Sequence, residues 1–142
     1  MPRNDVLEFV RESNLIEGIE REPTHLEVRE FRRFMELEEI TIDELRKFVR
    51  VYQPDARLRD IKGLDVRIGG YYPPPGGPYI AERLYDILHS HDDSFKTHIE
   101  YEKLHPFTDG NGRSGRALWA WRYRDLTRGF LTSFYFQTLN HI

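Results

Sequence analysis

Apolar residues recur at helical spacing in the first third of the chain. Two of these segments open with a Thr-x-x-Glu sequence, at Thr24 and at Thr41, in which both side chains satisfy free amides of a helix's first turn. An earlier segment shows the same spacing and can be capped by Asn4. We therefore predict three helices, whose apolar positions are Val6, Leu7, Val10 and Leu15, then Leu26, Phe31, Phe34 and Met35, and then Leu45, Phe48 and Val49.

The pattern changes after Pro54. Residues 64–68 alternate apolar and charged side chains, and Gly69-Gly70 and a proline-rich run at 71–78 follow them. Alternation before paired glycines favours a hairpin or an extended flap, whereas repeated proline cannot supply the amides of a strand ladder. We expect a small β-hairpin flap that leads into a stiff loop.

Helical spacing returns over residues 79–89, less cleanly over 95–104, and again from Ala117. Between them, the sequence HPFTDGNGRSGR at residues 105–116 interrupts the periodicity with glycines and a proline. A last helix is indicated by Phe130, Phe134 and Leu139. The chain is thus predicted to be a mostly α single domain, a helical bundle with a small flap, in which residues 105–116 form a loop that enters a helix.

Composition narrows the class of protein. The 142 residues are 39% hydrophobic and 32% charged, with a net charge of −3, so no general attraction to nucleic acid or to a membrane is expected. Cysteine is absent, which excludes disulfides and thiolate chemistry. The first residues hold no apolar run of the length of a signal peptide or a membrane span. We expect a cytoplasmic protein.

Residues 110–116 have the features of an anion site. A loop that ends at a helix N-terminus presents unpaired amides and the positive end of the helix dipole. Gly110 and Gly112 let the backbone of Gly110-Asn111-Gly112 approach a phosphate closely. Arg113 and Arg116 are three residues apart, so both project from one face of the helix's first turn. The segment is a candidate phosphate cradle.

Two further side chains beside the cradle bear on catalysis. Asp109 is placed to hold Mg²⁺ between phosphates, because this ion commonly binds one or two carboxylates and substrate oxygens. The intrinsic pKa of His105 suits removal of a proton near neutral pH. Together with the arginines, these residues indicate nucleotidyl transfer without a protein nucleophile.

Residues 105–116 match every fixed position of the signature HPFx(D/E)GNGRxxR, and the chain therefore resembles the Fic family. The resemblance extends from about Ser13 to the helix after Arg116. It implies AMPylation, the transfer of AMP from ATP to a Ser, Thr or Tyr hydroxyl of a target protein, with Mg²⁺. The implied roles are His105 as base, Asp109 as metal ligand, Gly110 to Gly112 with Asn111 as anion hole, Arg113 and Arg116 on the β- and γ-phosphates, Pro106 and Phe107 as structural residues, and Val66, Arg67 and Ile68 as the target-docking flap.

A second motif lies near the beginning of the chain. Ser13, Glu17 and Gly18 fit the pattern (S/T)xxxE(G/N), which resembles the inhibitory motif of Fic proteins. The resemblance implies an N-terminal inhibitory helix in residues 1–20, next to a Fic core in residues 21–142, with Glu17 paired to Arg116. Gly18 is equally a good residue for ending an ordinary helix, and both roles are compatible. Relatives of this kind sometimes also remove AMP, which the sequence does not decide.

Other readings stay open. A non-catalytic nucleotide-binding regulator or a toxin–antitoxin-type interaction module could keep the cradle, although binding alone requires neither His105 nor Asp109. Phosphoryl transfer is a third reading. The cluster of His89, His91, Asp92 and Asp93 could suggest a metal site, but residues two apart on a helix face different ways, so we expect a polar helix end. The target and the oligomeric state are not specified by the sequence.

Overall fold

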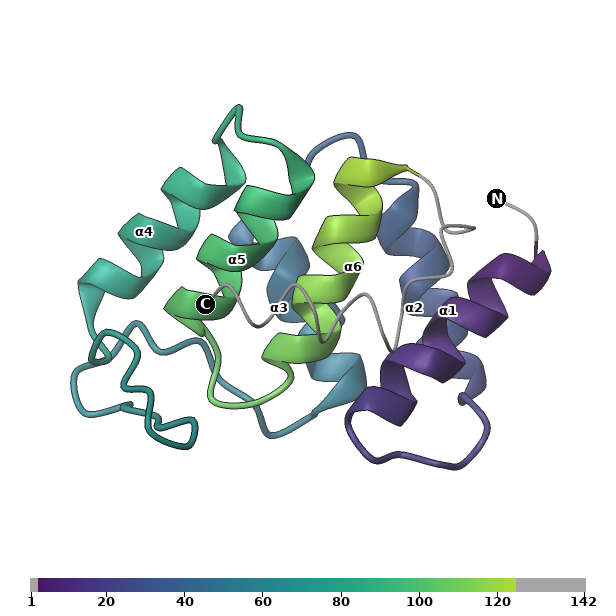
Figure 1. The fold of residues 1–142 in the computed structure, drawn as a ribbon, viewed down its shortest axis with the longest axis horizontal. Helices are drawn as coiled ribbons and strands as arrows, with labels where there is room; N and C mark the ends of the chain where they lie inside the picture. The colour runs from purple at the N-terminus through teal and green to yellow at the C-terminus, as the bar shows by residue number, and fades with distance from the viewer. Residues whose placement is uncertain (1–2, 125–142) are drawn as a thin grey trace.

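The structure is a computed structural model that describes residues 3–124 (Figure 1). The described residues form six helices and no strand, which confirms the mostly helical prediction. The last predicted helix, through Phe130, Phe134 and Leu139, lies outside them. The helices are α1 Arg3–Ile16, α2 His25–Met35, α3 Ile42–Tyr52, α4 Pro78–Leu88, α5 Ser94–Leu104 and α6 Asn111–Tyr123. None of these has the length and apolar character needed to cross a bilayer.

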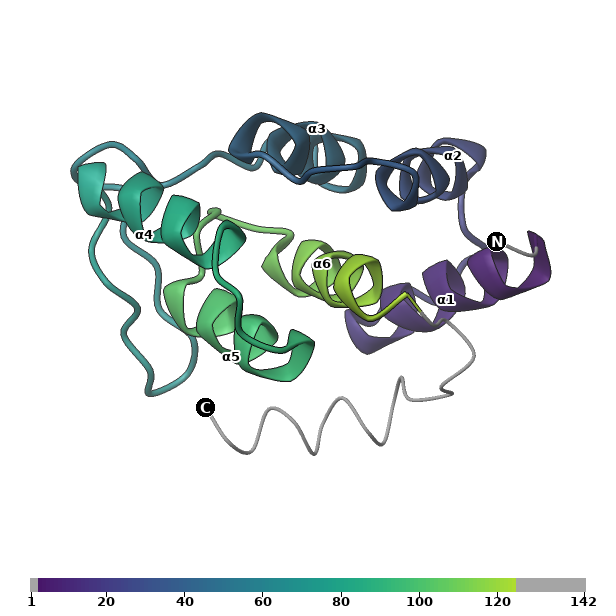
Figure 2. The ribbon, with the colours of Figure 1, turned by 90° about the horizontal axis from the view of Figure 1, so that it is seen from above.

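Helix α6 lies at the centre of the bundle. It packs against α5, α3, α2 and α1, while α4 packs on α5 and α3. Seen from above, α2 and α3 form one layer, and α6 lies beneath them with α5 and α1 on its two sides (Figure 2). The helix that follows residues 105–110 is therefore held by four other helices, which fixes its N-terminus in place.

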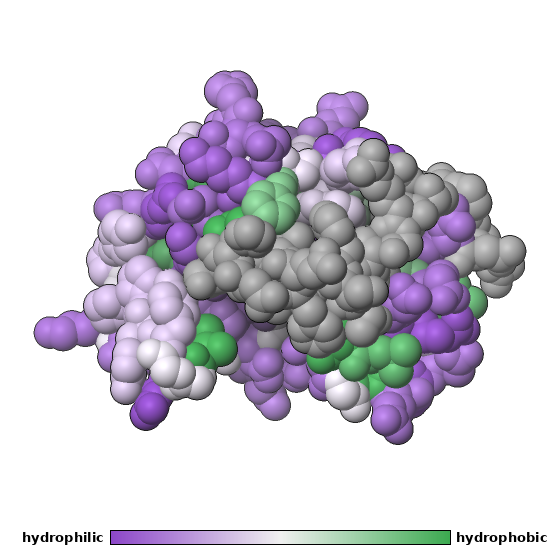
Figure 3. Space-filling view, in the orientation of Figure 1, coloured by the Kyte–Doolittle hydropathy of each residue, from purple (hydrophilic) through white to green (hydrophobic). Residues whose placement is uncertain are grey.

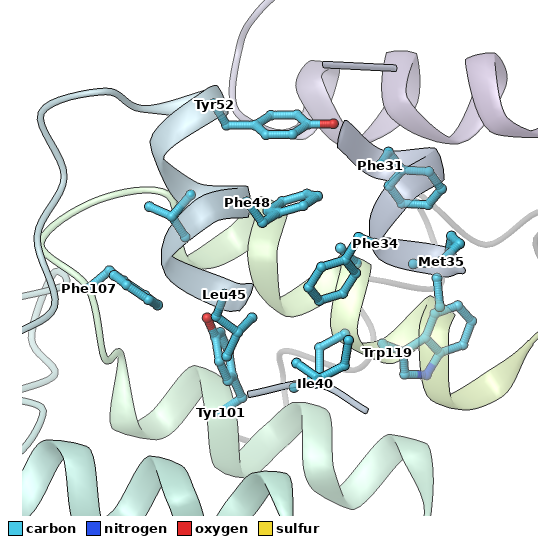
Figure 4. Packing of buried hydrophobic residues seen from close by; sticks show 14 of the residues in the cluster. Phe31, Phe34, Met35, Ile40, Leu45, Phe48, Tyr52, Tyr101, Phe107 and Trp119 are labelled. Atoms are coloured by element: carbon cyan, nitrogen blue, oxygen red, sulfur yellow. The ribbon is translucent and has the colours of Figure 1, made fainter. Parts of the chain in front are cut away.

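The core between these layers is aromatic. Phe34 packs against Phe48 with ring centroids 5.1 Å apart, and Phe48 stacks on Tyr52 at 4.5 Å. Phe107 is 1% exposed and points from the loop before α6 into the same cluster (Figure 4). Burying each such ring contributes roughly 1.5–3 kcal/mol of transfer free energy. Phe107 thus anchors the loop to the core.

The predicted helix starts hold to different degrees. Thr24 and Glu27 form a complete capping box on α2. The Thr41 hydroxyl accepts from the amide of Glu44, but no reciprocal bond forms, because the Glu44 carboxylate pairs with Arg33 at 2.6 Å. Helix α1 begins at Arg3, so Asn4 lies within the helix and the prediction that it caps α1 is wrong.

The expected hairpin flap contains no strands in the described structure. Residues 64–74 form an extended loop with one isolated antiparallel bridge, in which Ile68 and Tyr71 exchange backbone hydrogen bonds of 3.0 and 2.8 Å. Gly69 makes the turn with φ of 56°, and the prolines beyond Tyr72 end the pairing because they carry no amide proton. Figure 3 shows this loop at the lower left as a pale region beside the hydrophilic surface.

Arg122 joins the end of α6 to the end of α4. Its guanidinium donates to the carbonyls of Ile87, Leu88, Ser90 and Asp92 at 3.1–3.3 Å. A cation is favourable there, because the last carbonyls of a helix have no partner within it. Arg122 is thus a helix-capping residue at the end of α6 remote from the loop that precedes the helix.

Candidate active site

His105 lies immediately after α5, in a left-handed backbone conformation. Its φ is 50° and its amide donates to the Tyr101 carbonyl at 3.0 Å, which makes it the C-cap of the helix. Burial, and then the nearby Arg59 cation, lower the pKa of the His105 ring to about 4. The backbone of Glu102, and then the carboxylates of Asp109 and Glu17, oppose this shift. The ring is therefore neutral at pH 7 and able to accept a proton.

The loop from His105 to α6 is held from outside by residues 57–59 and from within by Asn111. Residues 106–108 pair with residues 57–59, through Arg59 N–H to the Pro106 carbonyl and Thr108 N–H to the Arg57 carbonyl, both at 2.8 Å. The Asn111 side chain closes the loop from within, since it accepts from the Phe107 amide at 2.9 Å and donates to the Phe107 carbonyl at 2.7 Å. Any contact of Asn111 with an anion therefore falls to its backbone amide.

The N-terminus of α6 has the form of an anion cradle. Gly110 is the N-cap with φ of 78°, and no side chain caps the helix. The amides of the first turn, from Asn111 onward, have no acceptor within the helix. Asp109 is exposed beside them, and one of its oxygens accepts from the Gly110 amide at 2.7 Å.

Arg116 is bound by the end of α1. Its Nε donates to the Ser13 hydroxyl at 2.7 Å, and its Nη2 donates to the Ser13 carbonyl at 2.9 Å and to Glu17 Oε2 at 2.6 Å. The guanidinium side chain is 1% exposed, whereas the Glu17 side chain is 38% exposed. The structure thus brings Ser13 and Glu17 into contact with Arg116, which follows them in the sequence by 103 and 99 residues.

The Glu17 carboxylate also lies on the cradle itself. A Cβ on Gly112 would collide with Glu17 Oε2 and would come within 3.2 Å of Arg116 Nη1. Glycine at this position is what lets the carboxylate reach the first turn of α6. A negative charge is stabilised there by the free amides and by the helix dipole. The Glu17 carboxylate therefore lies at a helix N-terminus, a place that favours anions.

Gly18 holds Glu17 in this position. It adopts φ of 78°, with its amide bonded to the Leu15 carbonyl at 2.9 Å, while the Ile19 amide bonds to the Asn14 carbonyl at 3.0 Å. These two bonds form a Schellman motif, in which Gly18 is the left-handed residue that ends the helix. The turn at Gly18 therefore both ends the helix and places Glu17.

Arg113 is engaged by three helices. It is 3% exposed, and its Nη1 donates to Asn14 Oδ1 at 3.2 Å and lies 3.7 Å from Glu27 Oε2. Its Nη2 bonds the Tyr52 carbonyl at 3.4 Å, and the guanidinium lies 5.2 Å from the centroid of the Tyr52 ring. Burial lowers the pKa of Arg113, and the Glu27 carboxylate opposes this. Both arginines of the cradle thus contact α1.

Glu27 is a residue that the sequence assigned only to a helix cap. Its carboxylate accepts from Arg21 at 2.9 and 3.0 Å and from the Asn14 amide at 3.3 Å, besides the Thr24 amide at 2.8 Å. With Arg113 nearby, this 3% exposed carboxylate connects α1, α2 and α6. The capping-box pattern located Glu27, but no signal in the sequence indicated its link to Arg113.

The described residues hold no preformed cluster of metal ligands. No group of three or more His, Asp or Glu side chains there is close enough to hold an ion. The His89–Asp93 segment ends α4 and begins α5, with the Asp93 carboxylate capping Lys96 N–H at 2.8 Å, as the helix-end reading expects. Asp109 remains the candidate Mg²⁺ ligand, and it suits an ion that shares its other ligands with substrate phosphates.

A comparison with models of protein families shows to which family the chain belongs. The family model of the Fic/DOC family matches residues 32–121, a span that includes α3 to α5 and the cradle. The chain belongs to the Fic/DOC family. Members of this family generally transfer a nucleoside monophosphate to proteins. No solved structure was found to match the chain.

The predicted target-docking residues of this Fic/DOC chain, Val66, Arg67 and Ile68, lie on the extended loop. Ile68 is 42% exposed at the bridge with Tyr71. Arg67 is exposed and lies over the ring of Tyr72, with its Cζ 5.2 Å from the centroid. The loop is tied to the end of α5, because the Tyr71 hydroxyl donates to the Lys103 carbonyl at 2.6 Å. An exposed, anchored segment of this kind is suited to pair with an extended peptide.

Proposed function

We propose that this Fic/DOC protein is an adenylyltransferase that moves AMP from ATP to a Ser, Thr or Tyr hydroxyl of a target protein, and that α1 inhibits it. The supporting observation is the Glu17 carboxylate, which is bound by Arg116 and rests on Gly112 at the N-terminus of α6. A site that holds a carboxylate through a guanidinium, beside the free amides of a helix N-terminus, is suited to phosphates by the same chemistry.

In the proposed reaction His105 is the general base. Its neutral ring takes the proton of the target hydroxyl as the hydroxyl oxygen attacks the α-phosphorus of ATP. The bond from that phosphorus to the oxygen bridging the α- and β-phosphates breaks, and pyrophosphate leaves with its electron pair. Arg113, Arg116 and the first amides of α6 would bind the triphosphate and the departing pyrophosphate. The proton on His105 then passes to solvent.

Asp109 would hold Mg²⁺ in this reaction. Its carboxylate is exposed beside the cradle, and one of its oxygens is already oriented by the Gly110 amide. A single carboxylate fits a Mg²⁺ ion that takes its remaining ligands from phosphate and water. When bound, the ion would neutralise phosphate charge. Orientation of the nucleotide by α6 and removal of the proton remain the work of the protein.

The proposed inhibition is a competition between two anions. Glu17 engages the Arg116 donors that would orient the γ-phosphate, and its carboxylate lies where phosphate oxygens would approach Gly112. ATP that enters beside it would bind with its α-phosphate displaced, and a displacement of about 1 Å can lower the rate roughly a hundredfold. In this proposal residues 1–20 are the inhibitory segment and residues 21–142 the Fic core.

Removal of Glu17 tests both parts of the proposal. The Glu17→Gly variant, incubated with ATP labelled on the α-phosphate, should modify itself or a protein in cell extract at least tenfold faster than the parent chain. Glu20→Gly is the matched control, since Glu20 is an exposed glutamate three residues further on. His105→Ala in the Glu17→Gly background should abolish labelling. Equal labelling of the Glu17→Gly and parent chains would refute the inhibition.

The other readings predict different labels. Phosphoryl transfer would place label from the γ-phosphate, and not from the α-phosphate, on protein. A non-catalytic regulator or an interaction module would bind labelled ATP reversibly and leave no covalent label in any variant. Incubation of AMPylated protein with the parent chain would reveal removal of AMP. If Glu17 aligns the hydrolytic water, as in some relatives, this removal should be lost in Glu17→Gly. Mass spectrometry of extract treated with Glu17→Gly would report the target.

A further inference from the structure

Arg59 is a fully buried arginine whose guanidinium is surrounded by backbone carbonyls. It is 0% exposed, and its contacts are Nε to the His105 carbonyl at 2.7 Å, Nη2 to the Leu104 carbonyl at 2.9 Å, and Nη1 to the Leu64 and Pro74 carbonyls at 3.1 and 2.9 Å. Hydrogen bonds from a charged donor are shorter and stronger than neutral ones. These four carbonyls belong to two different parts of the site.

Two of the carbonyls fix the backbone of the proposed base. Leu104 ends α5 and His105 follows it, so their carbonyls lack partners within the helix and lie at its negative end. His105 is not glycine, yet its φ is 50°, a conformation that persists only when the surroundings enforce it. The guanidinium of Arg59 bonds the carbonyl of His105 itself, and therefore fixes the peptide from which the imidazole projects.

The other two carbonyls lie at the two ends of the loop that carries Val66, Arg67 and Ile68. Leu64 precedes this loop and Pro74 follows its turn. The backbone around Arg59 adds to the connection, with the Gly77 amide donating to the Arg59 carbonyl at 2.9 Å and the Arg59 amide donating to the Pro106 carbonyl at 2.8 Å. One side chain thus holds both the proposed general base, His105, and the two ends of the proposed docking loop.

We propose that Arg59 is a positioning residue, which sets the backbone of His105 and registers the docking loop against it. This inference rests on the proposed function for its catalytic consequence, but not for its structural one. A planar guanidinium directs its donors along several fixed directions, so it reaches carbonyls on opposite sides at once. A lysine ammonium is a single point and cannot span them. Arg59→Lys keeps the charge and loses the geometry, whereas Arg59→Met loses both.

The first measurement follows the His105 ring by nuclear magnetic resonance and needs no activity. Histidine-labelled parent chain, Arg59→Met and Arg59→Lys are titrated from pH 8 downward, with His105→Ala used to assign the resonance. Burial is the main cause of the low pKa of His105, and the Arg59 cation is the second. Arg59→Met should therefore move the titration midpoint of His105 part of the way from about 4 toward its ordinary value near 6.5. Arg59→Lys should leave the midpoint lower than Arg59→Met does.

The second measurement follows transfer of labelled AMP in the Glu17→Gly background. Arg59→Met and Arg59→Lys should each lower kcat by about tenfold or more while changing KM for ATP much less, because the base and not the cradle is displaced. Arg122→Met is the matched control. Arg122 also donates to four carbonyls at a helix end, but lies eleven residues along α6 from Asn111, about 16 Å away. Its loss should leave both the His105 titration and kcat unchanged.

The outcomes separate this inference from the proposed function. If Glu17→Gly transfers nothing, the proposed function fails, and the titration of His105 still decides the placement by Arg59. If folded Arg59→Met keeps the parent titration and a kcat within about twofold of its background, the positioning role is refuted. Loss of the fold in both Arg59 variants would also refute it, because Arg59 would then be a residue of the core and not of the site.

Discussion

Arg116 and Glu17 form an unequal pair. The guanidinium is almost fully buried and keeps two bonds to Ser13 when the carboxylate is removed, whereas the Glu17 side chain is 38% exposed. Removing the Glu17 carboxylate should cost little stability, since it is partly exposed and water screens part of its interaction. We therefore expect that the contact can be broken without unfolding the chain, as the proposed inhibition requires.

Glu17→Gly should accordingly lower stability only slightly. We expect a loss of about 1 kcal/mol in the free energy of unfolding, measured by urea denaturation, in the same variant that gains transfer activity. Ser13→Ala removes the hydroxyl acceptor of the more buried Arg116 Nε and should cost at least as much, about 1–2 kcal/mol. A loss of several kcal/mol in Glu17→Gly would mean that α1 cannot release without unfolding.

His98 gives the fold a dependence on pH. It is 4% exposed, its Nδ1 lies 3.2 Å from the Gly115 carbonyl, and burial lowers its pKa to about 4. The unfolded chain, with an ordinary histidine pKa near 6.5, binds more protons than the folded chain between these values. Stability should therefore fall as pH decreases through this window.

Between pH 7 and pH 5 we expect His98 to account for a loss of about 2 kcal/mol in the free energy of unfolding. His98→Gln should remove this part of the pH dependence, whatever its effect at pH 7. The matched control is His91→Gln at an exposed position. Urea denaturation at a series of pH values measures both. An unchanged slope in His98→Gln would contradict the assignment.

The motif residues were predictable because their constraints are local. Gly110 and Gly112 serve a turn and a close approach within the same few residues, and the helix that follows supplies the amides. Arg59 was missed because its role is set by carbonyls that fold next to it, the nearest motif carbonyl being 46 residues away in sequence. Glu27 was located as a cap, but its link to Arg113 depends on the packing of α2 against α6.

At the scale of the elements, the C-terminal end of α1 sets the position of Glu17. The Schellman bonds at Gly18 and Ile19 fix where the chain leaves the helix, and so fix where Glu17 points. A Cβ on Gly18 meets nothing within 4 Å, so substitution there changes only the backbone preference, with φ at +78°. This makes the helix end a place where the proposed inhibition can be tested without changing the cradle.

Gly18→Ala should lower stability by about 1 kcal/mol and raise basal transfer, because the left-handed turn that presents Glu17 becomes strained. Gly63→Ala is a suitable control, since Gly63 also has a positive φ, of 96°, and open space around it, but lies outside α1. It should show a similar loss of stability without the gain in activity. Thermal unfolding and α-labelled ATP measure the two effects. A Gly18→Ala chain with parental basal transfer would contradict the role given to this turn.

The flap shows why an element can be predicted in place but not in type. Alternation over residues 64–68 and the paired glycines after them correctly located a turn. A hairpin also needs a second strand of free amides, and the prolines beyond Tyr72 cannot supply one. The loop is instead held by Arg59 and by the Tyr71 hydroxyl on Lys103, contacts that no local pattern reveals.

In the molecule as a whole, α1 is part of the bundle and also binds the two arginines of α6, Arg113 and Arg116. It packs against α2 and α6, and its Asn14 belongs to the buried polar network of Glu27 and Arg113. A nucleotide that takes the Arg116 donors must therefore weaken the attachment of α1, and by thermodynamic linkage α1 must weaken nucleotide binding by the same factor.

This reciprocity gives the last prediction. An ATP analogue that cannot be cleaved between its α- and β-phosphates should bind Glu17→Gly about tenfold more tightly than the parent chain, a difference of about 1.4 kcal/mol. In the parent, the same analogue should speed hydrogen exchange at the C-terminal amides of α1, while amides of α3 serve as the internal reference. In Glu17→Gly the analogue should leave exchange in α1 unchanged, because the competing carboxylate is gone. Equal affinities for the two chains would mean that Glu17 and the nucleotide do not share the cradle.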